Sequence, residues 1–460
     1  MIVAIIPAQG KSSRLPGKNM REIEGKPLLY WAIDAARRST NIEKIIVTTD
    51  DHNIAEYAIS QDVSVIMRGE DLCGDAPVVE VYKDAMVRSG LQSITHVVAI
   101  QPDHPDRSTD IDAAIELALE KNISDFITTD RYGVRHGSVR IMKSRDLLEG
   151  RLSYTSGAWV DNCINVHTEK DLRRAEASLI RKTRPLMIGN FALSEDGPTF
   201  VVAEAWTNHN AGLEMAKMKI DQAKKAGADA IKFQSYNAEN LVSRGNMQCY
   251  NPSDKSDYDV YRGIFEYCME KDIIFLTTTF DCEFADFSEE LGIAAFKIAS
   301  CDLPDVSLIR HVASKGRPVI MSTGACTLEE IRYSVDTILE AGNRDIILLQ
   351  RLLACPTKDE DANIRQIETL KGCFPETIVG ISDHTSPDES MTIPTAAVAL
   401  GAKVVEKHYT SCRNQPAKKH QFSIDPHLIE RMVRNIRVLE KSLGHPDIFI
   451  TDADIIKRKI

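Results

Sequence analysis

Eight strand-like apolar segments follow one another in the second half of the chain, and helical segments fill most of the gaps between them. These segments are residues 200–204, 230–234, 274–280, 295–300, 318–323, 346–350, 378–383 and 403–408. Eight strands alternating with helices over roughly 250 residues are typical of a (β/α)₈ barrel. The sequence therefore predicts a TIM-type parallel barrel over residues 186–445.

Polar side chains cluster at the carboxyl ends of these segments. They are Glu204, Lys232, Lys297, Ser300, Ser322, Asp383 and His408. Barrel enzymes build their sites at this end, because the loops that follow the strands share one face. A buried lysine that ends a strand is costly without a partner. We therefore expect Lys232 and Lys297 to be functional rather than structural.

The first half alternates strands and helices in a different arrangement. Residues 2–7, 45–49 and 97–101 have the character of buried parallel strands. A helical stripe over 28–36 and further helical patterns over 111–119 and 169–180 accompany them. This alternation predicts an open, Rossmann-like α/β sheet over residues 1–182. The boundary is expected within 181–199, where proline, glycine and charge break the periodicity.

Composition excludes several classes of protein. The net charge of −11 over 460 residues argues against general nucleic-acid binding. No apolar run reaches the ~18 residues that would suggest a membrane span, and the first residues lack the basic flank of a signal peptide. The ten cysteines include no CxxC pair. We therefore expect a cytoplasmic protein with reduced thiols, without a membrane or nucleic-acid partner.

A loop rich in small and basic residues follows the first predicted strand. It runs from Pro7 to Asn19, contains Gly10 and Gly17, and carries Lys11, Arg14 and Lys18. Small residues let backbone N–H groups approach a phosphate chain. The spacing of the glycines does not fit a P-loop, which also needs Ser or Thr after its lysine. The alternative is a solvated basic turn, but sheets of this kind bind ligands after their strands.

This loop, together with residues 25–29 (GKPLL) and 48–51 (TTDD), resembles the cytidylyltransferases that activate acidic nine-carbon sugars. The resemblance covers roughly residues 1–180. It implies that the anomeric hydroxyl of a nonulosonic acid attacks the α-phosphate of CTP, with Mg²⁺ as cofactor and release of pyrophosphate. The residues that match the nucleotide-binding loop are Gly10, Ser12, Lys18 and Asn19, and Arg14 is expected to replace a charge lost at Gln9 or Ser13.

Two aspartates are candidate metal ligands of this half. Asp103 follows the predicted strand 97–101, at the place where a related group of enzymes that activates eight-carbon sugars holds its metal. The sialic-acid group has a DxDT pair near the end of the domain, but this chain has Asn165 to Thr168 there. Asp161 lies just upstream and is a candidate substitute. An exposed turn aspartate is an equally good interpretation of Asp161.

The second half resembles the phosphoenolpyruvate-condensing sialic acid synthase family from about residue 186 to 440. The resemblance rests on six motifs in order, which begin at Glu204, Lys232, Lys297, Ser322, Ser382 and Glu406. It implies condensation of phosphoenolpyruvate with an N-acyl-hexosamine aldehyde. The phosphoenolpyruvate site would consist of Lys232, Lys297, Ser300, Ser322 and Ser382.

The same resemblance and the residue types imply further roles. His384 and His408 are candidate ligands of Mn²⁺ or another divalent cation that polarises the aldehyde. Glu204 is the candidate acid, base or orienting carboxylate. Asp302 stands where the family has a glutamate near the metal. The predicted catalytic residues of the chain are therefore Glu204, Lys232, Lys297 and Lys18.

Several positions depart from the synthase pattern. Leu353 and Cys355 replace polar residues that contact substrate, and Lys419 replaces an aspartate. Residues 446–460 are expected to form a short tail in place of the family's antifreeze-like domain, which supplies an arginine to a partner subunit. Three interpretations stay open: a working two-step fusion, an active transferase with a binding-only barrel, and a barrel with a changed acceptor sugar. The resemblance also suggests a homodimer or higher homo-oligomer.

Overall fold

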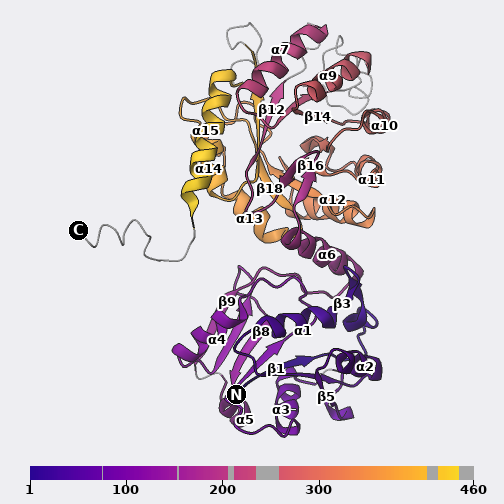
Figure 1. Cartoon of the computed structure of the whole chain (residues 1–460), viewed down its shortest axis with the longest axis vertical. Coiled ribbons are helices and arrows are strands. Elements are labelled where there is room, and N and C mark those ends of the chain that lie inside the picture. The colour runs from indigo at the N-terminus through magenta and orange to yellow at the C-terminus, as the bar shows by residue number, and fades with distance from the viewer. Residues whose placement is uncertain (75, 153–154, 206–211, 235–257, 412–422, 445–460) are drawn as a thin grey trace, which may run out of the picture. The chain divides into compact units, whose positions relative to one another are not determined.

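The computed structural model describes residues 1–74, 76–152, 155–205, 212–234, 258–411 and 423–444. The chain divides into two compact units (Figure 1). The sheet unit comprises Met1–Arg184 with Val335–Arg344 and Lys371–Thr377. The barrel unit comprises Pro185–Ser334, Asp345–Leu370 and Ile378–Ile460.

A seven-stranded mixed sheet forms the centre of the sheet unit, in the order β5-β4-β1-β6-β8-β7-β9. β1, β4, β5 and β6 run parallel, whereas β8 is antiparallel to both of its neighbours. The strands are β1 (Ile2–Pro7), β4 (Lys44–Thr49), β5 (Ser64–Met67), β6 (His96–Ile100), β7 (Asp125–Thr129), β8 (Arg135–Lys143) and β9 (Ser156–Val160). The predicted open α/β sheet is confirmed, and the antiparallel strand β8 is an addition that the sequence analysis did not predict.

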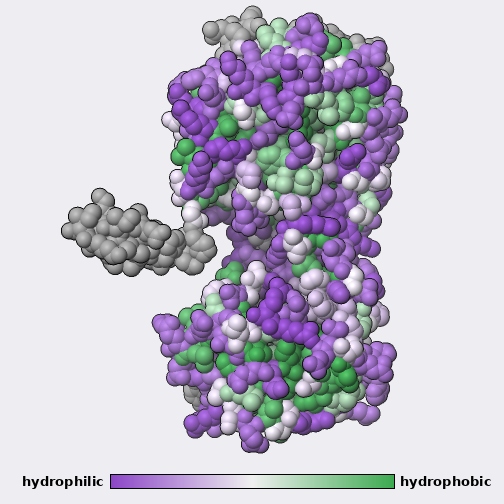
Figure 2. Space-filling view, viewed as in Figure 1, coloured by the Kyte–Doolittle hydropathy of each residue, from purple (hydrophilic) through white to green (hydrophobic). Residues whose placement is uncertain are grey.

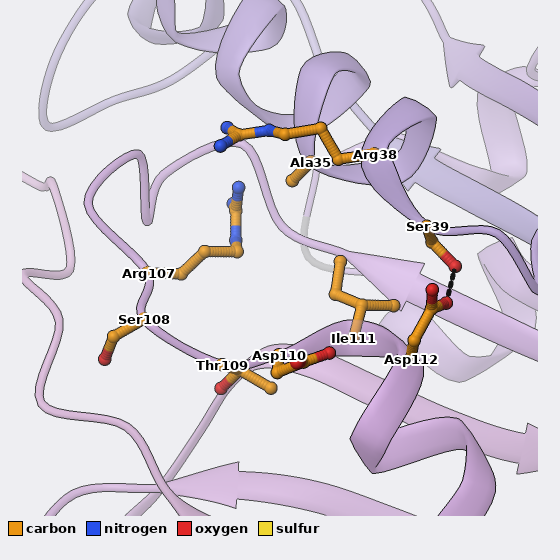
Figure 3. A pocket seen from close by; sticks show the side chains of 9 residues that line it. All are labelled: Ala35, Arg38, Ser39, Arg107, Ser108, Thr109, Asp110, Ile111 and Asp112. Atoms are coloured by element: carbon orange, nitrogen blue, oxygen red, sulfur yellow. Dashed lines mark hydrogen bonds between the residues drawn. The ribbon is translucent and has the colours of Figure 1, made fainter. Parts of the chain in front are cut away.

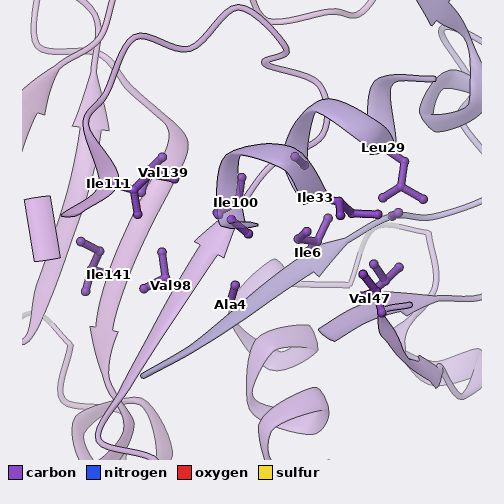
Figure 4. Close-up of a cluster of buried hydrophobic side chains, with 14 of the residues drawn as sticks. Ala4, Ile6, Leu29, Ile33, Val47, Val98, Ile100, Ile111, Val139 and Ile141 are labelled. Carbon is purple, nitrogen blue, oxygen red and sulfur yellow. The ribbon is translucent and has the colours of Figure 1, made fainter. Parts of the chain in front are cut away.

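Helices of the sheet unit pack apolar stripes against this sheet. In α1 the buried residues recur on one helical face, and Ile33 lies over Ile6 of β1 (Figure 4). Val98 and Ile100 of β6 continue the same core. The helices are α1 (Leu28–Arg38), α2 (His52–Ser60), α3 (Val78–Arg88), α4 (Ile111–Glu120), α5 (Ser144–Glu149) and α6 (Glu169–Thr183). This core fixes the carboxyl ends of β1, β4 and β6 next to one another.

Eight parallel strands close into a barrel in the order β12 to β19, with β19 paired to β12. They are β12 (Phe200–Ala205), β13 (Ala230–Gln234), β14 (Ile274–Thr278), β15 (Phe296–Ile298), β16 (Val319–Ser322), β17 (Ile346–Gln350), β18 (Ile378–Asp383) and β19 (Val404–Tyr409). All eight correspond to predicted segments, so the TIM barrel is confirmed. The predicted fourth segment, 295–300, ends early because Ser300–Asp302 form a 3₁₀ turn.

Helices surround the barrel between successive strands (Figure 1). They are α7 (Gly212–Lys225), α9 (Tyr258–Glu270), α10 (Cys282–Leu291), α11 (Val306–Ser314), α12 (Leu328–Glu340), α13 (Gln366–Cys373), α14 (Thr392–Ala399) and α15 (Pro426–Leu443). Several begin at an aspartate whose side chain accepts a hydrogen bond from the first turn, as Asp281, Asp305 and Asp425 do. These caps satisfy backbone groups that a helix start leaves unpaired.

A short hairpin seals the amino-terminal end of the barrel. It consists of β10 (Leu186–Ile188) and β11 (Phe191–Leu193), which pair antiparallel. Its apolar side chains join a core cluster with Phe200 and Val404, residues that begin β12 and β19. Because this end is filled with apolar residues, the polar strand ends face the opposite, carboxyl end. That end is where the fold places chemistry.

Hydrophobic side chains are largely held inside these two cores. In the view of Figure 2, hydrophilic residues cover most of the barrel unit, and the sheet unit shows a broader hydrophobic area. Among the described residues, we find no helix that is both long and apolar enough to cross a bilayer.

Candidate functional site

The loop after β1 folds back over the carboxyl ends of β1 and β4. Gly10 donates its N–H to Asp50 Oδ1 at 2.7 Å, and the Asn19 side chain donates to Gln9 O at 2.8 Å. A side chain at Gly10 would meet Asp51, whose nearest atoms lie 2.6 Å from an ideal Cβ position. Glycine is therefore required for this close approach. These contacts tie the loop to the TTDD segment that the sequence analysis singled out.

A cavity of about 220 Å³ lies beside this loop. The predicted site residues Lys18, Asn19 and Asp103 line it. Gly10, Ser12 and Arg14 are not among its lining residues, and Arg14 is exposed. The remaining lining residues are Pro7, Gln9, Arg68, Leu72, Gly74, Ala76, Val78, Val81, Gln101 and Pro102. The cavity thus joins the loop to the ends of β5 and β6.

Asp103 is held between two cationic or hydrogen-bonding partners in this cavity. Lys18 Nζ lies 2.6 Å from Asp103 Oδ2, and His104 Nδ1 lies 3.0 Å from Oδ1. Burial acts to raise the pKa of Asp103, but His104 and Lys18 outweigh it and hold that pKa well below its usual range. The carboxylate is therefore ionised, as a ligand of Mg²⁺ must be.

Arg68 is a cavity residue that the sequence analysis missed. It follows β5, and its guanidinium donates to Thr48 O at 2.7 Å and to Thr48 Oγ1 at 3.2 Å. Burial lowers the pKa of Arg68, yet a guanidinium keeps its charge at neutral pH. The sequence gives no signal for Arg68, because it is a single arginine after the short strand β5 (Ser64–Met67) and belongs to no motif. Its place beside the cavity follows only from the fold.

Asp161 lies elsewhere in the sheet unit's polar interior. Its side chain is 1% exposed, so it is not an exposed turn residue. Oδ1 accepts hydrogen bonds from Ser108 N and Oγ, and Oδ2 accepts from Thr109 and Ser138 hydroxyls. Both oxygens are therefore engaged by protein donors. This geometry favours a structural carboxylate, and we do not include Asp161 in the metal site proposed below.

Three other residues of this unit, His104, His136 and Cys163, offer ligand atoms within 4.8 Å of one another. However, His136 Nδ1 accepts from Ser138 N, and its Nε2 lies 2.9 Å from Asp161 O. Burial raises the pKa of the Cys163 thiol well above its usual value. This group therefore offers a metal little, because its donors are engaged or protonated.

A second cavity of the sheet unit, of about 380 Å³, contains no predicted site residue. Arg38 at the end of α1 and Arg107 before α4 extend toward it, and Ser39 hydrogen-bonds Asp112 at its edge (Figure 3). Arg107 also donates to Gln101 O, next to the first cavity. Arg107 therefore links the two cavities, since it lines the second and is hydrogen-bonded to a residue that lines the first.

Buried charges gather at the carboxyl end of the barrel. Glu204 on β12 lies opposite both Lys232 on β13 and His408 on β19 in the strand register. Lys297 on β15 reaches the same region. Each of these four side chains is only 1–2% exposed. Burying this many charged groups is costly unless they pair with one another. Ion pairs between the lysines and buried carboxylates meet this requirement.

Glu406 links the two lysines, and the sequence analysis did not select it for the site. Its Oε2 lies 2.7 Å from Lys232 Nζ, and its Oε1 lies 3.8 Å from Lys297 Nζ. Lys232 Nζ is also 3.1 Å from Glu204 Oε1. A usable signal was present: Glu406 is two residues before His408, so the two side chains of β19 point to the same face.

Ionisation of this network follows from burial and pairing. Burial lowers the pKa of Lys297 to about 8, against the attraction of Glu406. Burial acts to raise the pKa of Glu204, but Lys232 and the nearby histidines hold it well below its usual range. Arg351, after β17, adds a third cation that acts on Lys297. Lys232, Lys297 and Arg351 therefore supply the cations that a phosphate or carboxylate ligand needs.

The three predicted serines lie in or beside the network. Ser322 Oγ accepts a hydrogen bond from Lys297 Nζ at 2.7 Å, and Ser382 donates to Glu406 at 2.7 Å. Ser300 Oγ accepts from Gly324 N at 3.0 Å. All three are buried. The structure therefore brings Ser322 and Ser382 into direct contact with the charged residues, whereas Ser300 anchors the loop after β16.

His384, directly after β18, and His408, on the neighbouring strand β19, lie side by side with their Nε2 atoms 2.9 Å apart. His384 Nδ1 lies 3.0 Å from Ser382 O, and a carbonyl only accepts, so Nδ1 carries the proton. Burial lowers the pKa of His384 well below its usual value and that of His408 to about 4. Both imidazoles are therefore neutral at pH 7, and His384 Nε2 presents a lone pair. This donor set fits a divalent transition metal.

The departures from the synthase pattern lie in part within the described residues. Asp302 is buried after β15, whereas Leu353 and Cys355 are exposed after β17. Lys419 and the 446–460 tail lie outside the described residues. The exposed positions of Leu353 and Cys355 place this change at the mouth of the site, away from the buried Lys–Glu network.

Comparison with known proteins identifies both halves. Residues 3–149 match the Cytidylyltransferase family, and residues 219–447 match the NeuB family. An uncharacterised protein of Methanocaldococcus jannaschii is 40% identical over 56% of this chain and 76% of its own length. The N,N'-diacetyllegionaminic acid synthase of Legionella pneumophila is 35% identical over 53% of this chain and 73% of its own length.

A solved structure gives the same result. The N-acetylneuraminic acid synthetase of Leptospira borgpetersenii, in complex with citrate, is 31% identical. It aligns with a TM-score of 0.55 over 60% of this chain and 95% of its own length. The predicted order of the two enzyme families along the chain is confirmed. The chain is therefore a transferase that belongs to the NeuB family, with a synthase barrel that follows a cytidylyltransferase domain in one polypeptide.

Proposed function

We propose that residues 186–445 condense phosphoenolpyruvate with an N-acyl-hexosamine and that residues 1–182 activate the resulting nonulosonic acid with CTP. The two reactions are consecutive, so one polypeptide would carry a sugar from acceptor to CMP-linked donor. The observation that carries the proposal is the buried Lys232–Glu406–Lys297 network beside a pair of neutral histidines. Cations fixed in this way bind a phosphate and a carboxylate without reorganisation.

In the barrel reaction, a carbon–carbon bond forms between C3 of phosphoenolpyruvate and the aldehyde carbon. Water adds at C2, and phosphate leaves. Lys232, Lys297 and the three serines hold the anionic groups of phosphoenolpyruvate. Glu204, ionised and 3.1 Å from Lys232, orients the reacting oxygens or accepts a proton from them. His384 and His408 would hold Mn²⁺ or a similar divalent cation, which would polarise the aldehyde oxygen.

In the transferase reaction, the anomeric hydroxyl attacks the α-phosphate of CTP, and pyrophosphate leaves. Lys18 and Arg68 line the cavity and would supply positive charge to the triphosphate or hydrogen bonds to the polar atoms of the cytosine base. Asn19 fixes the loop that contains Gly10, Ser12 and Arg14, through its bond to Gln9 O. Asp103 is the proposed Mg²⁺ ligand because its carboxylate is ionised and lines the cavity. Binding of the metal would release Lys18 toward the phosphates.

The two other interpretations make different predictions for the barrel. A binding-only barrel would bind phosphoenolpyruvate without turnover. A barrel with a changed acceptor would turn over a sugar that fits a mouth with Leu353 and Cys355. Glu204, His384 and His408, which binding of phosphoenolpyruvate alone does not need, are retained beside the lysines, and this supports catalysis over mere binding. The homo-oligomeric state and the cytoplasmic location stay predictions.

The first experiment measures phosphate release from phosphoenolpyruvate by the purified full chain. Mn²⁺ and a panel of N-acylated hexosamines are supplied. We expect release with at least one sugar, and its loss in Lys297→Met. Lys358→Met is the matched control, because Lys358 is an exposed lysine after the same strand as Cys355. Binding of phosphoenolpyruvate without release for any sugar would overturn the proposed synthase reaction.

A further inference from the structure

Cys355 lies next to the two histidines of the barrel mouth. Its Sγ, one ring nitrogen of His384 and one of His408 lie within 4.8 Å of one another. Both histidines are buried, whereas Cys355 is exposed. From the sequence alone Cys355 was only a lost polar contact. In the structure it is the third potential donor at one point.

Backbone pairing holds Cys355 in this place. Thr357 donates its N–H to His384 O at 2.8 Å, and Thr357 and Thr385 form an isolated parallel bridge. The Thr357 hydroxyl also donates to Ala354 O at 2.7 Å. The segment 354–357 is therefore anchored beside the strand end that carries His384. These backbone contacts hold Cys355 Sγ close to the two imidazoles.

The histidines themselves are arranged for a cation. His384 Nδ1 bonds Ser382 O, which directs the His384 Nε2 lone pair toward His408 Nε2. His408 Nδ1 lies 3.7 Å from Glu204 Oε2, longer than a hydrogen bond but close enough for the carboxylate to stabilise a proton on Nδ1 once Nε2 binds a metal. Partners of this kind set the tautomer of metal-bound histidines. In the structure His408 Nε2–H donates to His384 Nε2 at 2.9 Å, and a cation held between the rings would take both Nε2 lone pairs while the His408 proton moves to Nδ1.

The three donor atoms at the mouth are one sulfur and two imidazole nitrogens, from Cys355, His384 and His408. Sulfur and imidazole ligands together select Zn²⁺, Co²⁺ or Fe²⁺ over Mn²⁺, which prefers oxygen.

We propose that Cys355 is a third protein ligand, which makes the barrel metal centre a His₂Cys site selective for a thiophilic divalent ion such as Zn²⁺. The proposal rests on the proposed function, because it takes His384 and His408 as the metal ligands. The site faces solvent through Cys355, so a fourth position stays open for the acceptor sugar's aldehyde, as catalytic zinc sites require. Leu353, the other departure at this mouth, supplies no ligand atom.

The test uses the full chain, stripped of metal with a chelator and titrated with Co²⁺. A thiolate ligand gives Co²⁺ a sulfur-to-metal charge-transfer band in the near ultraviolet, which imidazole and oxygen ligands do not give. We expect the band in the wild-type protein, its loss in Cys355→Ser, and its retention in Cys301→Ser. Cys301 is the matched control, because it is also an exposed barrel cysteine.

Affinity gives a second readout. Loss of an outer-shell partner alone costs about 10–100-fold in metal affinity, so Cys355→Ser should weaken Zn²⁺ binding by at least about tenfold. Mn²⁺ binding should change much less. Stoichiometric Co²⁺ that depends on His384 but shows no Cys355-dependent band would overturn the Cys355 proposal and leave the histidine site standing. Absence of any His384-dependent Co²⁺ would overturn both.

Discussion

The two sites of this chain differ in how their charges are held. In the barrel, Lys232, Lys297, Glu204 and Glu406 are buried on strands and compensate one another directly. In the sheet unit, Lys18 and Asp103 pair in a cavity, with side chains 15% and 16% exposed, and Lys18 comes from a loop. We therefore expect the charged pairs of the barrel to contribute strongly to the free energy of unfolding. The partly exposed pair of the sheet unit should contribute much less. Substitutions can separate the two cases.

The largest expected effect is the loss of stability in Lys232→Met. This change leaves Glu204 and Glu406 without their shared partner, and breaking a buried ion pair in this way costs about 3–5 kcal/mol. Lys18→Met is the matched change in the sheet unit, where a partly exposed pair contributes about 1 kcal/mol or less. Urea unfolding of both variants, followed by circular dichroism, measures the difference. Equal losses of stability would break the comparison.

Next in size is the catalytic effect of Asp103→Asn. The variant keeps the shape of the side chain but removes the charge that would bind Mg²⁺. We expect pyrophosphate release from CTP to fall about 10²–10³-fold, as for removal of one charge-stabilising group. Phosphate release from phosphoenolpyruvate in the same sample should stay unchanged and serves as the internal control. Unaltered pyrophosphate release would remove Asp103 from the site.

Much of this architecture could be predicted because it follows from periodicity. The eight barrel strands and the lysines, glutamate and histidines at their ends are read directly from apolar runs and their last residues. The side chains of a strand alternate between its two faces, so the direction of each is known once the strand is known. The register pairs Glu204 with both Lys232 and His408, which brings the three side chains together. Local pattern and global fold agree in this half.

The residues that escaped prediction are those set by tertiary contact. Arg68 reaches the cavity beside Lys18 and Asp103 only because the fold brings the end of β5 next to the loop after β1. Glu406 sits within a buried strand, where its role depends on lysines from two other strands. Cys355 was interpreted as a loss because its neighbours His384 and His408 are distant in sequence. In each case the partner, not the residue type, defines the role.

Asp161 offers a smaller test within the sheet unit. Its four donors make it a structural carboxylate, so Asp161→Ala should leave buried hydroxyls unpaired and lower stability by about 1–3 kcal/mol. Asp161→Asn, which retains the shape, should leave the Mg²⁺ dependence of pyrophosphate release within about twofold of wild type, because Asp161 does not line the cavity that contains Asp103. A large shift in the Mg²⁺ titration would restore Asp161 as a ligand.

A last expected effect, which needs no substitution to be seen, is a pH dependence that belongs to the barrel alone. Burial lowers the pKa of Lys297 to about 8, so this lysine loses its proton as the pH rises through that value. Phosphoenolpyruvate needs the charged form, and kcat/KM reports the free enzyme. We therefore expect kcat/KM for phosphoenolpyruvate to fall about tenfold per pH unit above pH ~8. Lys297→Arg keeps its charge throughout and should lose this falling limb, even at lower activity. If both proteins show the same decrease above pH ~8, a group other than Lys297 loses the proton. Burial would then not set the charge of Lys297 in the pH range of the experiment.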